Sequence, residues 1–305
     1  MRPAAATAPA PAREESPIQV TDLRAGQRLE AELACSRKDR LTARNGSVYL
    51  ALELRDRSGS LPARVFRDVD RVGLRFEAGD AVAVTGRVER FRGELVAELD
   101  EIRRLEPGSY DPARFLPAAY RSVEELEGFL EHLIGEVHHD GLHRVVNDLI
   151  VSGPHAAEFR RAPCTRGGHH AYLGGLIEHT VAVGTLVLET CQLHRRLNSD
   201  LLMAAALVHD VGKVREFTYG AEFGISDEGR MLGHLTIGSE LISGAAASLE
   251  DELRLGLLGC VLSHHGPDSA GRSGRGGFSS PEALALYRIN ALDASVKGAL
   301  EHGSL

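Results

Sequence analysis

The chain of 305 residues is long enough for about two domains, and its hydrophobic share of 43% and charged share of 26% are ordinary for a globular protein. No apolar run reaches the roughly 18 residues that a membrane-spanning helix needs, so we expect no membrane partner. The net charge of −8 comes from the part beyond residue 106, because residues 18–106 are almost balanced and are less repulsive to a polyanion.

The N-terminal segment, residues 1–17, is rich in Ala and Pro and lacks the leucine-rich or valine-rich centre of a signal peptide. We therefore predict a disordered lead. The cysteines are scattered without paired spacing, at Cys35, Cys164, Cys191 and Cys260. This pattern predicts reduced thiols in a cytoplasmic protein, with no zinc knuckle and no disulfide framework.

Residues 18–106 contain short runs of alternating apolar and polar residues that indicate β-strands. The runs are QRLEAELACSR, GSVYLALELRD, GSLPARVFRD, DAVAVTGRVERF and GELVAELDEIRRL, and turn signals such as Asn45-Gly46 and Arg92-Gly93 separate them. VDRVGLRFEAG, after the third run, is predicted to form a short helix. Strands in this order are typical of an OB-type barrel that binds nucleic acid, and another small β-barrel is the alternative.

Residues 107–121 carry several prolines and are predicted to be a linker. From Ser122 onward, apolar residues recur at helical spacing, and Ser122 with Glu125 forms a typical N-terminal capping pair. Further helices are predicted at LHRVVNDLIVS, LIEHTVAVGTLVLETCQLH, DLLMAAALVHD, HLTIGSELISGAAASL, EDELRLGLLGCVLSHHG and SPEALALYRINALDASVKGALEH. The predicted fold class is α+β with two domains, a small OB-type β-barrel followed by an all-α domain over residues 122–305.

Histidines lie inside or at the ends of these apolar helices. LVHDVGK places His209 beside Asp210, where a buried charged pair is costly unless it is partnered or bound to a metal. Three other apolar helices carry His179, His234 and the pair His264-His265. One such histidine is more often a hydrogen-bonded core residue than a ligand. Histidines from four helices of one bundle instead indicate a metal site, in which Asp210 can bridge two ions.

These motifs resemble those of a known family. HHAYLGGLIEHT, LVHDVGK, DEGRMLGHLTIGSELI and LSHHG are similar to segments of the YhaM-type 3′→5′ exoribonucleases, which join an N-terminal OB domain to an HD domain, a metal-dependent phosphohydrolase domain. NGSVYLALELRDRSGSLPARVF resembles the OB segment of the same family, and the resemblance covers about residues 18–297. It implies a metal-dependent 3′→5′ exoribonuclease of single-stranded RNA, with single-stranded DNA as a further substrate.

The resemblance also implies a site for two divalent metal ions, with Mn as the first candidate and Fe, Co or Mg as alternatives. The implied ligands are His179, His209 and Asp210 for one ion, and Asp210, His234, His264 and His265 for the other. The family closes this site with a late aspartate, but INALDA here places Asn290 at that position and Asp293 three residues later. Either residue is a candidate to complete the first set, although an asparagine offers a carbonyl oxygen without charge. Asp210 and Lys213 are the predicted catalytic residues, with Lys213 contacting the phosphate.

Candidate contacts to nucleic acid are aromatic and basic residues of the first domain and one histidine of the second. VERFRG places Phe91 between two arginines near a turn, which is typical of surfaces that grip single strands. The predicted contacts are Tyr49, Phe66, Phe91, Lys38, Arg44, Arg90, Arg92 and His170. A core position is the alternative for each aromatic residue, and a surface pair is the alternative for His169 with His170.

Two other functions remain open. A phosphodiesterase or nucleotidase for small nucleotides would need no strand-binding barrel, and Asn290 is compatible with an RNA-binding protein whose metal site has decayed. We expect a cytoplasmic protein, and a homo-oligomer is compatible with this sequence.

Overall fold

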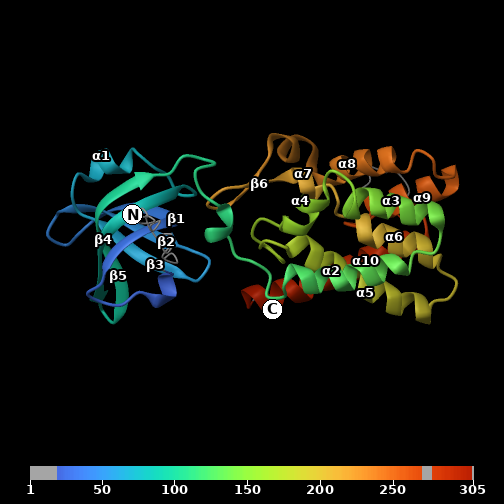
Figure 1. Ribbon diagram of the computed structural model, residues 1–305, viewed down its shortest axis with the longest axis horizontal. Helices are drawn as coiled ribbons and strands as arrows, with labels where there is room; N and C mark the ends of the chain where they lie inside the picture. The colour runs from blue at the N-terminus through green and yellow to red at the C-terminus, as the bar shows by residue number, and fades with distance from the viewer. Residues whose placement is uncertain (1–18, 270–276, 304–305) are drawn as a thin grey trace, which may run out of the picture. The chain divides into compact units, whose positions relative to one another are not determined.

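The computed structural model describes residues 19–269 and 277–303 and divides the chain into two compact units, Met1–Tyr110 and Asp111–Leu305 (Figure 1). The predicted disordered lead lies outside the described residues. The division falls within the predicted linker, residues 107–121. The later part of that linker packs with the second unit, because the Leu173 amide donates to the Pro117 carbonyl at 2.8 Å. Each unit has its own hydrophobic core.

The first unit is a closed barrel with the strand order β1-β2-β3-β5-β4. Its strands are β1 (Arg28–Thr42), β2 (Val48–Arg55), β3 (Ser60–Val65), β4 (Ala81–Phe91) and β5 (Glu94–Arg104), with helix α1 (Val69–Gly73) after β3. All pairs are antiparallel except β3 with β5. The predicted OB-type barrel with a helix after the third strand is therefore confirmed (Figure 1).

Alternation along the strands separates the barrel core from its surface. In β2, Leu50, Leu52 and Leu54 are buried, while the residues between them are partly exposed. Gly86 lies at an irregularity in the β4–β5 pairing, and a Cβ atom there would come within 2.2 Å of the Glu98 carbonyl oxygen. A glycine is therefore required at this bend of the barrel wall.

The second unit is mainly helical. Its helices are α2 (Val123–Gly135), α3 (Asp140–Val146), α4 (Ala156–Arg161), α5 (Gly175–Leu193), α6 (Ser199–Val208), α7 (Lys213–Glu216), α8 (Asp227–Ala245), α9 (Asp251–Leu262) and α10 (Pro281–His302), with a π-helical segment at Asn147–Val151. The predicted helical domain is confirmed, with one addition. A small antiparallel hairpin of β6 (Phe217–Tyr219) and β7 (Phe223–Ile225) follows α7, and its strands are too short to show a period of two in the sequence.

Helix α6 lies at the centre of this unit. Its residues from Leu201 to Val208 are all buried, and it packs against α5, α9 and α10 (Figure 1). An apolar helix that is covered on all sides can end in the interior, so residues 209 and 210, which follow it, are buried as well. None of the helices in the described parts of the chain is long and apolar enough to cross a membrane.

Two glycines determine how α8 approaches the end of α6. Helix α8 is interrupted at Gly233, whose φ of 68° and ψ of 159° suit glycine alone, so that His234 begins a new helical segment. Gly212 lies against this segment, and a Cβ atom there would be 2.0 Å from the His234 carbonyl oxygen and 2.6 Å from the Gly238 amide nitrogen. The backbone after α6 can therefore pack directly on the backbone of α8.

Candidate functional site

Segments that are far apart in the sequence bring metal-ligating side chains to one place in the helical unit. Helix α5 supplies His179, the turn after α6 supplies His209 and Asp210, α8 supplies His234 after its kink, and the turn after α9 supplies His264 and His265. Their candidate ligand atoms form two groups that share Asp210, and within each group these atoms lie within 4.8 Å of one another. The structure thus brings together the histidines that the sequence singled out.

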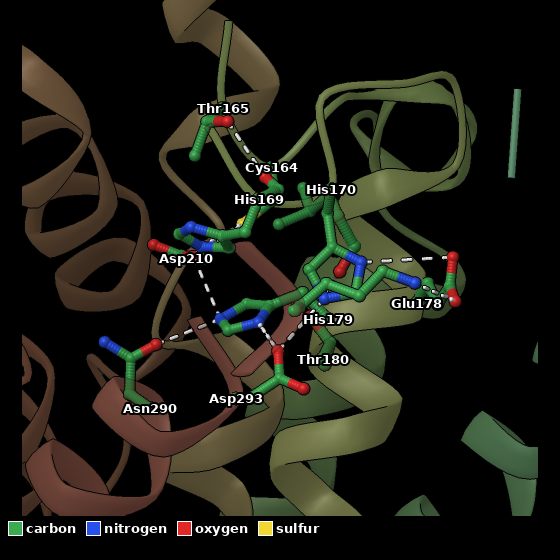
Figure 2. Close-up of polar contacts among 12 residues, drawn as sticks. Cys164, Thr165, His169, His170, Glu178, His179, Thr180, Asp210, Asn290 and Asp293 are labelled. Carbon is green, nitrogen blue, oxygen red and sulfur yellow. Dashed lines mark hydrogen bonds and ion pairs between the residues drawn. The ribbon is translucent and has the colours of Figure 1, made fainter. Parts of the chain in front are cut away.

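The first donor group consists of His179, His209, Asp210 and Asn290. Asp210 Oδ2 lies 3.7 Å from His179 Nε2 and 3.4 Å from His209 Nε2. The two imidazole nitrogens are 3.2 Å apart. Asn290 Oδ1, from α10, lies 3.0 Å from His179 Nε2 (Figure 2). Four potential ligand atoms therefore converge on this side of Asp210.

The second donor group consists of Asp210, His234, His264 and His265. Asp210 Oδ1 lies 3.5 Å from His234 Nε2 and 3.4 Å from His264 Nε2, and His265 Nε2 lies 3.0 Å from His234 Nε2. Each carboxylate oxygen of Asp210 thus faces a different group. One carboxylate in this position is able to bridge two cations.

The hydrogen bonds behind the rings determine where their protons lie. The Nδ1 atoms face oxygen acceptors: Ala206 O at 2.7 Å from His209, Val261 O at 2.6 Å from His264, and Asp293 Oδ2 at 2.6 Å from His179. A carbonyl oxygen or a carboxylate only accepts, so each Nδ1 carries the proton and each Nε2 presents a lone pair to the site. Asn290 Nδ2 donates to the His264 carbonyl at 3.2 Å, which turns its oxygen toward His179.

These donors fit divalent cations. Among the described residues, Asp210 Oδ1 and His264 Nε2 are buried without a hydrogen-bond partner. Burial lowers the pKa of His264 to about 3 and the pKa values of His179 and His265 to about 4, so that the rings are neutral at pH 7. Converging lone pairs of neutral imidazoles and a carboxylate are costly alone and are satisfied by a transition-metal ion.

Lys213, which the sequence predicts to be catalytic, points into the centre of the site. Its ammonium group lies 2.7 Å from Asp210 Oδ2 and 3.3 Å from Cys164 Sγ. Burial opposes both charges, but the mutual attraction outweighs it, so the pKa of Asp210 lies well below and the pKa of Lys213 well above its ordinary value. The catalytic role of Lys213 stays a prediction.

Asp293 and His170 form a second layer behind the first donor group. Figure 2 shows Asn290 and Asp293 on opposite sides of the His179 ring, so that Asp293 contacts Nδ1 and not the converging Nε2 atoms. His170 is buried, with Nε2 3.0 Å from Asp293 Oδ2 and Nδ1 2.9 Å from the Tyr172 hydroxyl. The burial of His170 favours a role in orienting Asp293 over the predicted contact with nucleic acid.

Several partners of the site carry no signal in the sequence. Cys164 lies in the loop before α5, and its Sγ lies 3.8 Å from Asp210 Oδ2 and 3.6 Å from His169 Nε2. Glu216 lies 3.4 Å from His234 Nδ1. No spacing rule links these residues to the motifs, and only the fold places them together.

On the barrel, aromatic and basic side chains gather outside the core. The rings of Tyr49 and Phe66 lie 5.5 Å apart, and Phe66 and Phe91 are each 43% exposed. The guanidinium carbon of Arg64 lies 4.1 Å from the centre of the Phe91 ring, and that of Arg92 lies 5.4 Å from it. Arg64 was not singled out by the sequence. Exposed rings beside arginines are suitable platforms for unpaired bases.

The other predicted contacts on the barrel have different surroundings. Arg44 is exposed in the loop between β1 and β2. Arg90 donates to the Gly93 carbonyl at 2.8 Å within the β4–β5 turn. Lys38 donates to the carbonyl oxygens of Gly73 and Phe76 at 2.8 and 2.5 Å and to Glu77 at 2.7 Å, so its ammonium group attaches β1 to the end of α1 and to the segment that follows it.

Comparisons with known proteins match both units. A family model for the HD domain matches residues 176–295, and one for an OB-fold nucleic acid binding domain matches residues 35–105. The 3′-5′ exoribonuclease YhaM of Oceanobacillus iheyensis is 30% identical over 277 residues, which cover 89% of this chain and 85% of that protein. The chain belongs to the YhaM exoribonuclease family. The YhaM proteins of Bacillus subtilis and Listeria welshimeri are 29% and 28% identical, over 89% and 91% of this chain and 86% and 88% of their own.

Membership of the YhaM family confirms the resemblance that the motifs indicated. The matched HD segment begins just before His179 and ends just after Asp293, so it contains every candidate ligand of both donor groups. An HD domain implies binding of divalent metal ions, in agreement with the two groups of converging donors.

Proposed function

We propose that this protein is a metal-dependent 3′→5′ exoribonuclease that hydrolyses the phosphodiester bonds of single-stranded RNA, with single-stranded DNA as a further substrate. The observation that carries the proposal is Asp210, whose two oxygens face two groups of imidazoles. Membership of the YhaM family and the presence of an OB-type barrel in the same chain support a polymer substrate over a small nucleotide.

The helical unit holds the reacting groups. Two divalent cations, with Mn first and Fe, Co or Mg as alternatives, would be held by His179, His209, Asp210 and Asn290 and by Asp210, His234, His264 and His265. When bound, such ions neutralise the phosphate charge and activate water. The carbonyls of Ala206 and Val261 fix the rings of His209 and His264 before any ion arrives. The ammonium group of Lys213 remains charged and stabilises negative charge that develops on the phosphate.

The barrel would hold the strand. Bases would stack on the exposed rings of Phe66, Phe91 and the partly exposed Tyr49. Arg44, Arg64 and Arg92 would neutralise backbone phosphates. We also propose a cytoplasmic location, which the reduced thiols of Cys164, Cys191 and Cys260 support.

A labelled-RNA experiment tests the proposed function. Purified protein is incubated with Mn²⁺ and single-stranded RNA labelled at the 5′ end, and the products are separated by length. We expect a ladder of RNAs shortened from the 3′ end, and no shortening by His209→Ala. His194→Ala is the matched control, because His194 is an exposed histidine at the end of α5 and should leave the activity unchanged.

Two results would contradict the proposal. Shortening by the native protein that does not exceed that of His209→Ala would exclude catalysis at this centre. Loss of a 5′ label as mononucleotides, with the 3′ end intact, would exclude the proposed direction.

A further inference from the structure

Cys164 is a buried thiol beside the metal centre that the mechanism above does not use. It is 1% exposed and lies in the loop between α4 and α5. Its sulfur atom is surrounded by polar groups: Lys213 Nζ at 3.3 Å, His169 Nε2 at 3.6 Å and Asp210 Oδ2 at 3.8 Å. Burial raises the pKa of this thiol to about 12, although the charged Lys213 opposes the rise, so the thiol is protonated in the metal-free protein and only an ion bound at the sulfur would displace its proton.

The loop that carries the thiol is held in a defined conformation. The Cys164 amide donates to the His170 carbonyl at 3.0 Å. Thr165 Oγ1 donates to the His169 carbonyl at 2.8 Å and accepts from the Gly168 amide at 2.8 Å (Figure 2). These bonds fix Cys164 and His169 on the same side of Asp210.

The small negative charge of the first donor group is a second argument for Cys164 as a ligand. Burial keeps the ring of His179 neutral and Asn290 carries no charge, so Asp210 is the one carboxylate among the donors of both groups. Asp293, the carboxylate behind the first donor group, is engaged by Nδ1 of His179 and Nε2 of His170. A thiolate at Cys164 would add a second negative charge directly beside Asp210 Oδ2.

The spacing of the atoms suits coordination. Cys164, His169 and His179 each offer a ligand atom, and these atoms lie within 4.8 Å of one another. Bonds of about 2.0–2.3 Å to nitrogen, oxygen and sulfur place neighbouring ligand atoms roughly 3.3–3.8 Å apart. The sulfur-to-oxygen and sulfur-to-nitrogen distances of 3.8 and 3.6 Å agree with this spacing. The ammonium group of Lys213 lies 3.3 Å from the sulfur and 2.7 Å from Asp210 Oδ2, so these two atoms together already attract one positive charge.

We propose that Cys164 is a thiolate ligand of the cation at the first donor group, with His169 as an accessory ligand. When the ion binds, the S–H bond breaks, the proton leaves to solvent, and the sulfur donates its electron pair to the ion. A thiolate favours borderline or soft ions, so this position takes Zn²⁺, Fe²⁺ or Co²⁺ in preference to Mg²⁺, whereas the second group offers only imidazoles and a carboxylate. The inference rests on the metal centre proposed above and not on RNA cleavage.

Cobalt spectroscopy of the full chain tests this ligand. Metal-free protein is titrated with Co²⁺, and the near-ultraviolet absorption is followed for a sulfur-to-cobalt charge-transfer band. We expect the band in the native protein and in Cys191→Ser, and its loss in Cys164→Ser. Cys191 is a matched control because it lies on α5 twelve residues beyond His179, more than three helical turns away.

The affinity of the same variants gives a second readout. Cys164→Ser should lower Co²⁺ affinity at one of the two positions by at least about tenfold, and His169→Ala should lower it while keeping the band. Circular dichroism of each variant checks that its fold is unchanged.

Each outcome decides the inference. A native spectrum without the band, or a band that persists in Cys164→Ser, overturns it. RNA shortening without the band would leave the proposed function and remove this ligand. A Cys164-dependent band without RNA shortening would support Cys164 as a ligand and contradict the proposed function.

Discussion

Asn290 determines the charge of the first donor group. Its oxygen lies 3.0 Å from His179 Nε2, and its amide nitrogen donates to the His264 carbonyl at 3.2 Å. Asn290→Asp adds a negative charge at the oxygen but replaces the donating nitrogen by an acceptor. We expect Mn²⁺ to bind about tenfold more tightly, which corresponds to about 1.4 kcal/mol. The metal-free variant should lose about 1–3 kcal/mol of unfolding free energy.

Titration of free Mn²⁺ by electron paramagnetic resonance and urea unfolding measure these two effects. Asn45→Asp is the control for added charge, because Asn45 is exposed in a barrel loop and should leave Mn²⁺ affinity unchanged. Equal Mn²⁺ affinity in native protein and Asn290→Asp would show that residue 290 is not a ligand.

The buried imidazoles of His179 and His264, together with the more exposed ring of His265, make the metal-free protein sensitive to acid. Burial lowers the pKa of His264 to about 3 and the pKa values of His179 and His265 to about 4, against about 6.5 in an unfolded chain. Below about pH 6.5 the unfolded chain therefore binds protons that the folded chain does not. The unfolding free energy should fall as the pH drops from about 6.5 towards about 4.

The pKa of His170 is shifted in the opposite direction, and this shift only partly offsets the loss of unfolding free energy. Burial lowers its pKa, but its hydrogen bond to Asp293 and its attraction to Glu178 outweigh burial and raise the pKa, so the stability it contributes is present at acidic pH and is lost as the pH rises. Urea unfolding of chelator-treated protein between about pH 7 and about pH 4.5 measures the net effect. An unfolding free energy that stays constant or rises towards acid would contradict the prediction.

Individual candidate ligands could be predicted from the sequence where they follow a helical pattern. Four of the histidines stand at the ends or on the inner faces of apolar helices: His179, His209, His234 and His264. The helical spacing of the apolar residues around them therefore shows where they lie. Cys164 could not be found in this way, because its contact with Asp210 joins residues 46 positions apart and depends on the path of a loop. The orientation of Asn290 is likewise set by a distant carbonyl.

At the scale of elements, the kink in α8 aims His234 at Asp210. Gly233→Ala places a side chain in a backbone conformation reserved for glycine, with φ of 68° and ψ of 159°. We expect a loss of about 1–3 kcal/mol in unfolding free energy and weaker Mn²⁺ binding at the second donor group. Denaturant unfolding and Mn²⁺ titration measure both.

Gly244→Ala provides the matched control in the same helix. Gly244 has no positive φ among the described glycines, and a Cβ atom there would meet nothing within 4 Å. This change should leave Mn²⁺ affinity unchanged and raise helix stability by up to about 1 kcal/mol. Equal effects of the two substitutions would show that the kink does not position His234.

The sequence predicted most of the strands and helices, but not the kink within α8 or the hairpin of β6 and β7. Strand alternation and helical spacing indicated the barrel and the helices, and the predicted cap at Ser122 is present, since Ser122 Oγ accepts from the Glu125 amide at 3.2 Å. The prediction began a helix at His234, whereas α8 begins at Asp227, where Ser226 caps it, and is broken at Gly233. A glycine in a helical pattern does not reveal whether it bends the backbone. The strands of the hairpin β6–β7 are too short to show the alternation of apolar and polar residues that indicates a strand.

At the scale of the whole molecule, each unit has a core of its own, so each should fold alone. A truncated chain of residues 111–305 should bind two Mn²⁺ ions and hydrolyse a dinucleotide. It should shorten long RNA less efficiently, by at least about tenfold in kcat/KM, because stacking is worth about 1–3 kcal/mol per base. Metal analysis and kinetics on both substrates test this expectation.

Full-length Phe91→Ala is the companion variant, and it should weaken RNA binding without changing the number of bound ions. Unchanged turnover of oligonucleotides by residues 111–305 would favour the phosphodiesterase that acts on small nucleotides. The change of period near residue 106 made the two-domain fold visible in the sequence. The shared role of Asp210 depended on three-dimensional packing.

Folding places Asp210 Oδ1 and His264 Nε2 together in the interior, and neither has a hydrogen-bond partner within the described residues. An ion that binds only the folded chain raises its unfolding free energy by RT ln(1 + [L]/Kd), which is about 2.7 kcal/mol when the free ion concentration is a hundredfold above Kd. Cells starved of the ion would therefore contain a larger unfolded fraction of this protein, and proteases degrade unfolded protein. Ion supply would thus govern the lifetime of the protein as well as its rate of catalysis.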